Sequence, residues 1–405
     1  MVTVYSHIVN FILLLQLSLS KPQRNHLLSI MHGIVLCDGR KTITAMRRQT
    51  KTNRDLSCMT RFLSESPWNH HTINRQRRRF LQQLVRREQK KCPDKQLVFL
   101  LVDDTGCMKN ATTRKMERLD FHFLHAEGKT VWSHVLVTSH VVTGNISAAY
   151  DFRPYFREEA CTELGIGFKS KIDLAIELVQ DFDVSDDERV YVLFDSWYAS
   201  KKLIDACNAK GFHVIAAFKT NRMMYPAGIQ VKVSDFAQQY IRHTDLRSVT
   251  VGDHRYRVYE YEGQLSDIEN VEVLLCWEDG FSPEKTPFCI LCTDGALDVV
   301  TILRHYLVRW NIETGYRYFK DLLGFDQYQM QSYQAIERFW TIQYLVYAYL
   351  EFQRLQWTKE DAMTLGDVVR RIRNEYLGNI VCYVYQQALE NRPLLKVLNT
   401  LHLIA

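Results

Sequence analysis

TILRHYLVRWNIETGYRYFKDLLG, residues 301–324, predicts a single helix, because no proline interrupts it and Gly324 supplies a stop signal. At about 100° per residue, five polar side chains fall within one stripe of this helix. They are Tyr306, Arg309, Glu313, Arg317 and Lys320. The opposite side is predicted to be apolar and buried, and it carries Leu303, Leu307, Val308, Ile312, Tyr318, Phe319 and Leu322.

Two interpretations of this polar stripe are open. A carboxylate among cations suits a metal ion beside phosphates, with Glu313 on the metal and the three cations near the phosphates. The alternative is a solvated helix face on which Glu313 forms ion pairs with Arg309 and Arg317. Four residues follow the pattern Y-x2-R-x3-E-x6-K: Tyr306, Arg309, Glu313 and Lys320. This pattern resembles the YREK signature of the insertion-sequence DDE transposases, and the resemblance favours the metal site.

Two apolar runs upstream each end in an aspartate. Leu97–Val102 is followed by Asp103-Asp104, and Val190–Phe194 is followed by Asp195. Such runs predict buried strands that deliver a carboxylate at their ends.

The predicted elements between residues 97 and 218 run strand, strand, strand, helix, strand, helix, strand. They are Leu97–Val102, Leu119–His125, Val131–Thr143, Lys169–Asp181, Val190–Phe194, Ser200–Lys210 and His213–Phe218. This alternation predicts an α/β sheet, and its order resembles the ribonuclease H-like fold. The DDE transposases carry their acids on the first strand, the fourth strand and a later helix. The resemblance therefore implies that Asp104, Asp195 and Glu313 are the catalytic, metal-binding acids. Asp104 is preferred to Asp103 because Asp104-Thr105 resembles the family's local motif.

The resemblance also implies a cofactor and DNA contacts. Three carboxylates suit Mg²⁺, with Mn²⁺ as a substitute, because both are hard ions that prefer oxygen ligands. Tyr306, Arg309 and Lys320 would hold phosphates near the transposon end, and the helix geometry adds Arg317. Trp310 would either stack on a flipped base or pack in the core, and the sequence leaves both open.

The front of the chain is strongly basic. Residues 1–95 contain 18 Lys and Arg against 5 Asp and Glu, whereas the whole chain has a net charge of only +5. Helical patterns at Pro22–Cys37, Lys41–Thr50, Asn53–Ser64 and Arg75–Lys91 predict that residues 1–93 form a helical DNA-binding domain. The last helix supplies the candidate DNA-binding residues Arg75, Arg78, Arg79, Arg86 and Arg87. A solvated basic face is the alternative.

The predicted catalytic core occupies residues 94–218 and 297–332, the second part holding the Glu313 helix. Residues 219–296 are predicted to form a β-rich insertion, with strands at Gln230–Val233, Ser248–Tyr261, Asn270–Trp277 and Pro287–Cys292. Residues 333–405 are predicted to form a C-terminal helical region, with helices at Ala335–Leu355, Leu365–Tyr376 and Asn379–Leu389.

Cysteine usage and hydropathy bear on location. Ten cysteines without a regular framework fit a reducing cytoplasm, and DNA binding would add association with the nucleoid. Cys289 and Cys292 form one C-x2-C, which we interpret as two buried strand cysteines rather than a zinc site. The apolar run Ile8–Leu19 is too short for a membrane span and is predicted to be a packed helix.

The sequence thus predicts a cut-and-paste DNA transposase. It would cleave duplex DNA at terminal inverted repeats and join the freed 3′-hydroxyl to target DNA at a pair of metal ions. Two protomers are expected because two ends must be joined. The alternatives are a catalytically silent DNA-binding protein derived from a transposase, and a nuclease of the same fold.

Overall fold

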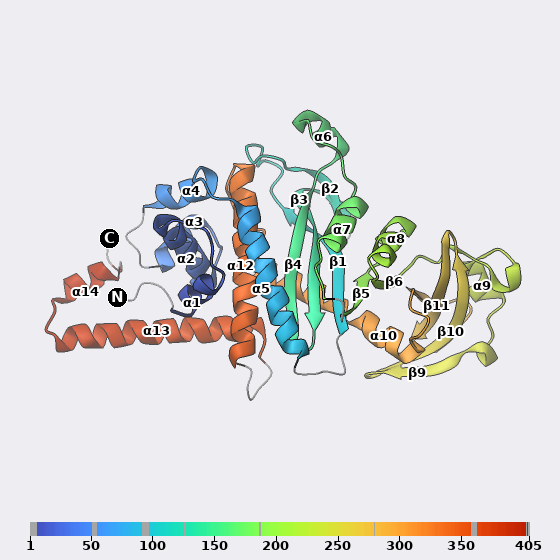
Figure 1. The fold of residues 1–405 in the computed structure, drawn as a ribbon. Helices are drawn as coiled ribbons and strands as arrows, with labels where there is room; N and C mark the ends of the chain where they lie inside the picture. The colour runs from blue at the N-terminus through green and yellow to red at the C-terminus, as the bar shows by residue number, and fades with distance from the viewer. Residues whose placement is uncertain are drawn as a thin grey trace.

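A mixed sheet forms the centre of the computed structural model, and helices from both ends of the chain pack together at one end of it (Figure 1). The structure describes residues 6–50, 55–90, 97–124, 127–185, 188–278, 280–357, 363–401 and 403. Within these residues the sheet has 12 strands, in the order β2-β3-β1-β5-β6-β12-β11-β10-β7-β8, with β4 beside β3 and β9 beside β10. The predicted fold class, an α/β ribonuclease H-like core with helices at both ends, is confirmed.

The catalytic half of the sheet follows the ribonuclease H-like order β4-β3-β1-β5-β6. Its strands are β1 (Leu97–Met108), β2 (Asp120–Leu124), β3 (Lys129–Thr143), β4 (Ile146–Tyr155), β5 (Arg189–Phe194) and β6 (His213–Ala217). Strand β3 is antiparallel to β1 and β4, whereas β1, β5 and β6 are parallel. Helix α7 (Lys171–Gln180) leads into β5, and α8 (Lys201–Ala209) connects β5 to β6, in the order that the sequence predicted.

Two predictions for this half were wrong. Strand β1 does not end at Val102 but continues through both aspartates to Met108. The segment predicted as a loop around Arg153 and Pro154 is strand β4, followed by the short helix α6 (Glu158–Leu164). Proline is tolerated there because β4 is bonded to β3 alone and has a free outer edge.

The predicted insertion continues the same sheet. It contains β7 (Met223–Met224), β8 (Val231–Lys232), α9 (Val233–Gln239), β9 (Arg247–Val251), β10 (His254–Leu265), β11 (Ile268–Glu278) and β12 (Phe288–Cys292). Strand β12 pairs with β6, so hydrogen bonding is continuous from the core into this part. The predicted strand Ser248–Tyr261 is instead the hairpin β9–β10, which turns at Gly252 with φ +60°. Cys289 and Cys292 are both buried in β12, as predicted.

Helices from the two chain ends form the remaining layer. The N-terminal helices are α1 (Ser6–Leu14), α2 (Lys21–Leu36), α3 (Ile43–Gln49), α4 (Leu56–Ser64) and α5 (His70–Gln89), which match the predicted ones with shifted ends. The C-terminal helices are α12 (Tyr333–Trp357), α13 (Leu365–Leu389) and α14 (Leu394–Thr400). The two predicted helices after Trp357 are one, because Gly378 lies inside α13 and does not stop it.

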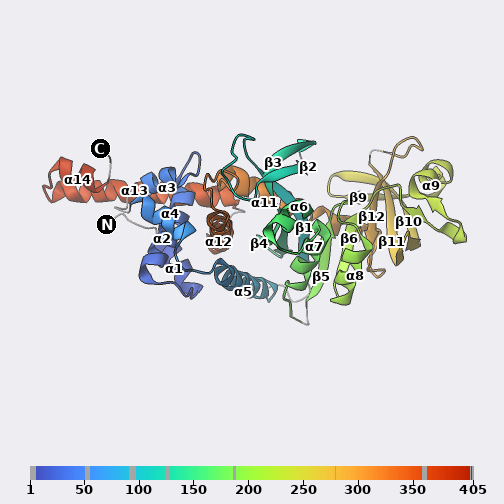
Figure 2. The same cartoon turned by 90° about the horizontal axis from the view of Figure 1, so that it is seen from above.

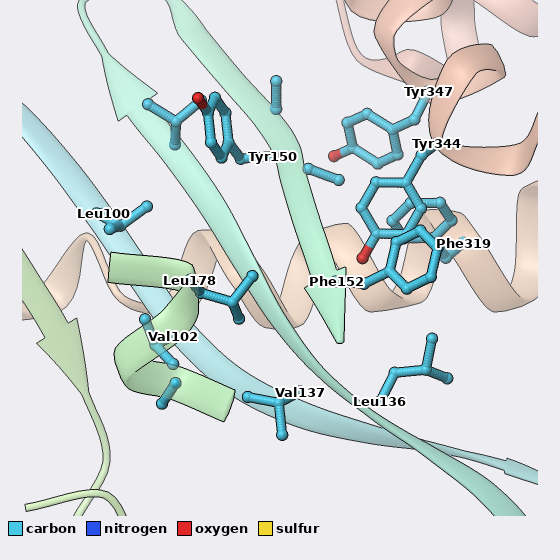
Figure 3. Close-up of a cluster of buried hydrophobic side chains, with 14 of the residues drawn as sticks. Leu100, Val102, Leu136, Val137, Tyr150, Phe152, Leu178, Phe319, Tyr344 and Tyr347 are labelled. Carbon is cyan, nitrogen blue, oxygen red and sulfur yellow. The ribbon is translucent and has the colours of Figure 1, made fainter. Parts of the chain in front are cut away.

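Helix α12 is the centre of this layer. It is buried along most of its length, and its aromatic residues pack as the sequence predicted. Figure 3 shows Tyr344 and Tyr347 against Phe319, and Tyr344 also against Phe152 of β4. No helix within the described residues is long and apolar enough to cross a membrane.

Three buried histidines predict sensitivity to acid. Burial lowers the pKa of His32 and His134 to about 4 and that of His140 to about 3. The unfolded chain, with histidine pKa values near 6.5, therefore takes up protons first as the pH falls. Stability is expected to be complete above pH ~6.5 and to decrease by up to ~2 kcal/mol per histidine at pH ~5.

Urea unfolding across this pH range would measure the effect. Replacing the exposed His243 with glutamine should leave the pH dependence unchanged. A pH-independent midpoint in the parent chain would contradict the prediction.

Candidate active site

The helix predicted at Thr301–Gly324 is divided into three segments. They are α10 (Val299–Leu307), α11 (Trp310–Arg317) and one turn of π-helix at Tyr318–Leu322. Hydrogen bonds between residues three apart replace the α-helical ones at the first division, from Val308 N–H to the His305 carbonyl and from Arg309 N–H to the Tyr306 carbonyl. The helical conformation ends before Gly324, which has φ +66° and is the residue at which the sequence predicted a stop.

The division of the helix changes which side chains of the polar stripe are exposed to solvent. Tyr306 is buried against Phe288, whereas Leu307, which was predicted to be buried, is 37% exposed. Trp310 is 55% exposed, so of its two predicted roles core packing is excluded. The tighter turn at Val308 and Arg309 rotates α10 relative to α11. A prediction that assumes one uniform helix from Thr301 to Gly324 therefore places Leu307 on the buried side by mistake.

Glu313 forms an ion pair with Arg309, whose guanidinium Nη2 lies 2.8 Å from Oε1. Burial alone would lower the pKa of Arg309, but Tyr306, Glu313 and Asp103 together raise it. Arg317 is exposed and Lys320 is half-buried. The ion pair between Glu313 and Arg309, which was the alternative to a metal site for this polar stripe, therefore exists in the structure.

Helix α11 packs directly on the sheet. Gly315 approaches β3 so closely that a Cβ there would lie 3.0 Å from the ring of His140. The Tyr316 hydroxyl is 2.7 Å from the Thr138 hydroxyl, also on β3. These contacts determine how close α11, and with it Glu313, lies to the sheet.

Asp195 comes directly after β5 and shapes the turn that follows. Its Oδ1 accepts the backbone N–H groups of Trp197 at 2.9 Å and Tyr198 at 3.3 Å. The carboxylate is half-buried, and the neighbouring Trp197 is 37% exposed. The second apolar run therefore delivers its acid at the strand end, as the sequence predicted.

Asp103 and Asp104 point to opposite faces of β1, and the structure shows which helix covers each face. Asp103 pairs with Thr138 across the strands, so both side chains lie on the face that α11 covers. Asp104 pairs with Val137 and lies on the face of α7. In the parallel register Leu101 is beside Leu193, so two residues further along Asp103 is beside Asp195.

Asp104 is held by two polar partners. Lys171 Nζ lies 2.7 Å from one carboxylate oxygen, and the Tyr198 hydroxyl donates to the other at 2.9 Å. Lys171 also lies over the rings of Tyr155 and Trp197. An ammonium ion thus already balances the charge of this carboxylate.

Asp103 has a different electrostatic environment. Burial, and then the carboxylates of Asp104 and Asp195, raise its pKa to about 8, although Arg309 acts in the opposite direction. Asp103 therefore lies among other carboxylates, and such a group of like charges is one that a bound divalent cation would neutralise.

The acids are of the kind that binds a hard divalent ion, and two of them already contact cations. Carboxylate oxygens are the ligands that Mg²⁺ and Mn²⁺ prefer, and cations already contact Asp104 and Glu313. Within the described ranges, no three His, Cys, Asp or Glu side chains lie close enough together to hold a metal ion.

The candidate arginines of α5 differ in exposure. Arg75, Arg79, Arg86 and Arg87 are exposed. Arg78 forms an ion pair with Asp151 at 3.0 Å, and the neighbouring Arg77 is fully buried. The cations of this helix are therefore not equally available to DNA; Lys91, at its end, lies outside the described residues. Figure 2 shows α5 and α11 on opposite sides of α12, so the two predicted DNA-binding groups are not adjacent.

The sequence did not indicate three residues of this site. Lys171 begins α7, and Trp197 and Tyr198 lie in the turn after Asp195. Their proximity in sequence to Asp195 was a signal for the two aromatic residues. Lys171 had none, because only the packing of α7 brings it to β1.

A ribonuclease H-like sheet with aspartates on two adjacent parallel strands and a glutamate on a helix packed against it defines an enzyme of the DDE class. The family model described as DDE superfamily endonuclease matches residues 14–244, more than half of the chain, and a second, described as Transposase DDE domain, matches residues 166–349. The chain therefore belongs to the DDE superfamily endonucleases, whose activity is transposase-type cleavage of DNA with divalent metal ions. No curated protein matches it.

Proposed function

We propose that this protein is a cut-and-paste DNA transposase of the YREK type. It cleaves at the terminal inverted repeats of its insertion sequence and joins the 3′-hydroxyl ends to target DNA by phosphoryl transfer at two metal ions. The observation that carries the proposal is the α10–α11 segment, in which Tyr306, Arg309 and Glu313 lie on the part of the sheet where the strands of Asp103 and Asp195 are adjacent.

Asp195 and Glu313 are proposed metal ligands, together with one of the two aspartates of β1: Asp104, which the sequence predicted, or Asp103, which lies beside Asp195 on the face that α11 covers. Mg²⁺ is the proposed ion, with Mn²⁺ as a substitute. A divalent metal supplies charge neutralisation at the phosphate and an activated oxygen nucleophile. The chain's own residues prepare the site: Lys171 and Tyr198 hold the Asp104 carboxylate in place, and the backbone N–H groups after β5 orient Asp195.

The DNA contacts divide into two groups. Arg309, Arg317, Lys320 and Tyr306, with the exposed ring of Trp310, are proposed to contact the strand that is cleaved. The exposed arginines of α5, within the proposed N-terminal DNA-binding domain of residues 1–93, would contact the duplex elsewhere. Arg78 has the weakest support, because Asp151 already pairs with it.

The test is incubation of the full chain with a duplex that carries the flanking terminal repeat, with and without Mg²⁺. Cleavage followed by joining to a second duplex supports the transposase. Cleavage without joining indicates a nuclease of the same fold, and binding without cleavage in Mg²⁺ or Mn²⁺ indicates a catalytically silent DNA-binding protein.

The choice between Asp103 and Asp104 can be tested directly. Asp104→Asn is expected to abolish metal-dependent cleavage and to weaken Mn²⁺ binding, measured by electron paramagnetic resonance. If Asp104 is the ligand, as the sequence predicted, Asp103→Asn is expected to retain cleavage within about tenfold. The reverse outcome would assign the metal to the face that α11 covers.

We propose that two protomers associate through the end of α13. Residues 377–389 contain no charged side chain, and Leu377, Val381, Tyr385 and Leu389 are each more than 60% exposed. An uncharged helix exposed on all sides needs a partner, and it offers nothing to the phosphates of DNA. A second copy is the partner that joining two DNA ends requires.

Val381→Glu is therefore expected to convert the complex with DNA from two protomers to one in sedimentation experiments. Gln387→Glu places the same charge on the other side of α13 and serves as the control. An unchanged protomer number in Val381→Glu would exclude this surface.

A further inference from the structure

The hairpin of β2 and β3 exposes aromatic side chains on the edge of the catalytic sheet. Phe121 and Phe123 lie on β2, the outermost strand at this end of the sheet, and each side chain is 50% exposed. Exposed aromatic side chains on an edge strand favour aggregation unless a partner covers them. The hairpin surface, which we define as Phe121, Phe123 and Trp132, is therefore accessible to a ligand.

The register places these three side chains on one face. Phe121 pairs with Trp132 and Phe123 pairs with Thr130, and cross-strand partners project to the same side. The rings of Phe121 and Trp132 are 4.9 Å apart, at an angle of 56°. Side chains two residues apart on a strand are separated by about 7 Å, which is close to twice the spacing of stacked bases.

Cations lie beside the hairpin surface. The Trp132 indole donates to the carbonyl of Thr113 at 3.4 Å, which brings the loop carrying Arg114 and Lys115 next to the rings. Both cations are exposed, and within the described ranges neither forms an ion pair. The loop is fixed at its other end, where the Tyr333 N–H donates to the Glu117 carboxylate at 2.7 Å.

The hairpin surface faces the same side as α11. Along β3, Thr138 contacts Tyr316 of α11, and Trp132 is six residues further on the same face, about 20 Å away. Figure 2 shows β2 and α11 on the same side of the molecule. A DNA strand leaving the acids along β3 would reach the rings after roughly six nucleotides.

We propose that the hairpin surface binds unpaired bases of the DNA strand that flanks the cleavage site. This rests on the proposed function. Phe121 and Phe123 provide stacking faces for bases, and Arg114 and Lys115 neutralise the adjoining phosphates. Aromatic side chains beside unpaired cations are the combination that single-stranded DNA requires, because each base has an apolar face and each linkage a charge.

The test compares binding of a short single-stranded oligonucleotide and of the same sequence as a duplex, by fluorescence anisotropy without divalent metal. The double variant Phe121→Ala/Phe123→Ala is expected to lose about 10- to 100-fold in single-strand affinity, with little change on the duplex. Its slope of log affinity against log salt should be unchanged. Arg114→Ala/Lys115→Ala should reduce that slope by about 0.7 for each cation.

Two controls keep the result interpretable. Tyr240→Ala removes an aromatic residue that is 59% exposed in the insertion and should have no effect. Phe121→Leu/Phe123→Leu keeps apolar side chains on the strand without the rings and should lose single-strand affinity as the alanine variant does.

Equal losses on single strand and duplex, or no loss, would overturn the proposal. So would a change in sedimentation of the alanine variant with unchanged DNA binding, because the surface would then join two copies of the chain. Binding is measured without metal, so the result is separate from the cleavage test. Loss of catalysis in the site variants, with intact binding here, would leave the hairpin surface standing.

Discussion

Replacement of Glu313 by glutamine is expected to reduce metal-dependent DNA cleavage by at least about a thousandfold, equivalent to ~4 kcal/mol of transition-state stabilisation. Glutamine keeps the shape of the side chain but removes the negative charge that is proposed to hold a metal ion. The folded structure should persist, because Glu313 is partly exposed and its ion pair with Arg309 lies within one turn of the same helix.

DNA binding should respond in the opposite direction. The substitution frees the Arg309 guanidinium and removes a negative charge beside the phosphates, so affinity without metal should stay the same or rise. Cleavage rates and anisotropy titrations on the same duplex measure the two effects. Glu375→Gln, which breaks a similar ion pair with Arg371 on α13, should change neither. Cleavage at the parent rate in Glu313→Gln would exclude this residue as a metal ligand.

The second large effect is expected at Arg77. Its side chain is completely buried where α5 meets β4, and its guanidinium donates to the carbonyls of Ala149 and Tyr150 and to the Asn74 side chain. Burial lowers its pKa to about 10, so it remains charged. Arg77→Met leaves two buried carbonyls and a polar network without their donor, which should cost about 3–5 kcal/mol of unfolding free energy.

Arg79→Met is the matched control, because Arg79 is exposed two positions further along the same helix. It should leave the urea midpoint unchanged while lowering duplex affinity and the steepness of its salt dependence. Equal stability of the two variants would contradict the structural role of Arg77.

The contrast between Arg77 and Arg79 shows how much of this helix could be predicted from the sequence. The helix Arg75–Lys91 was predicted from its apolar residues, yet its cations were treated as one group. Arg77 lies four residues after Ile73 and four before Leu81, both buried, so the helical period alone placed it on the inner face. What the period could not provide is the partner, since the carbonyls of β4 lie more than 70 residues away.

The aspartates of β1 show a second kind of limit. Alternation along a strand put Asp103 and Asp104 on opposite faces, but it could not say which helix covers which face. That depends on the packing of α7 and α11, which begin and end far along the chain. The break after Leu307 was equally invisible, because Val308 and Arg309 keep right-handed helical angles and differ from their neighbours only in hydrogen bonding.

The two ends of the chain are structurally interlocked. Arg338 of α12 donates to the carbonyls of Leu63 and Trp68, and Arg373 of α13 donates to those of Val35 and Cys37. During synthesis, the core of the N-terminal helices therefore cannot close until roughly the last fifth of the chain, which begins with α12, has been made. A prematurely terminated polypeptide would leave those helices without their packing surface, and it would not act as a separate DNA-binding fragment that competes with the complete enzyme for its sites.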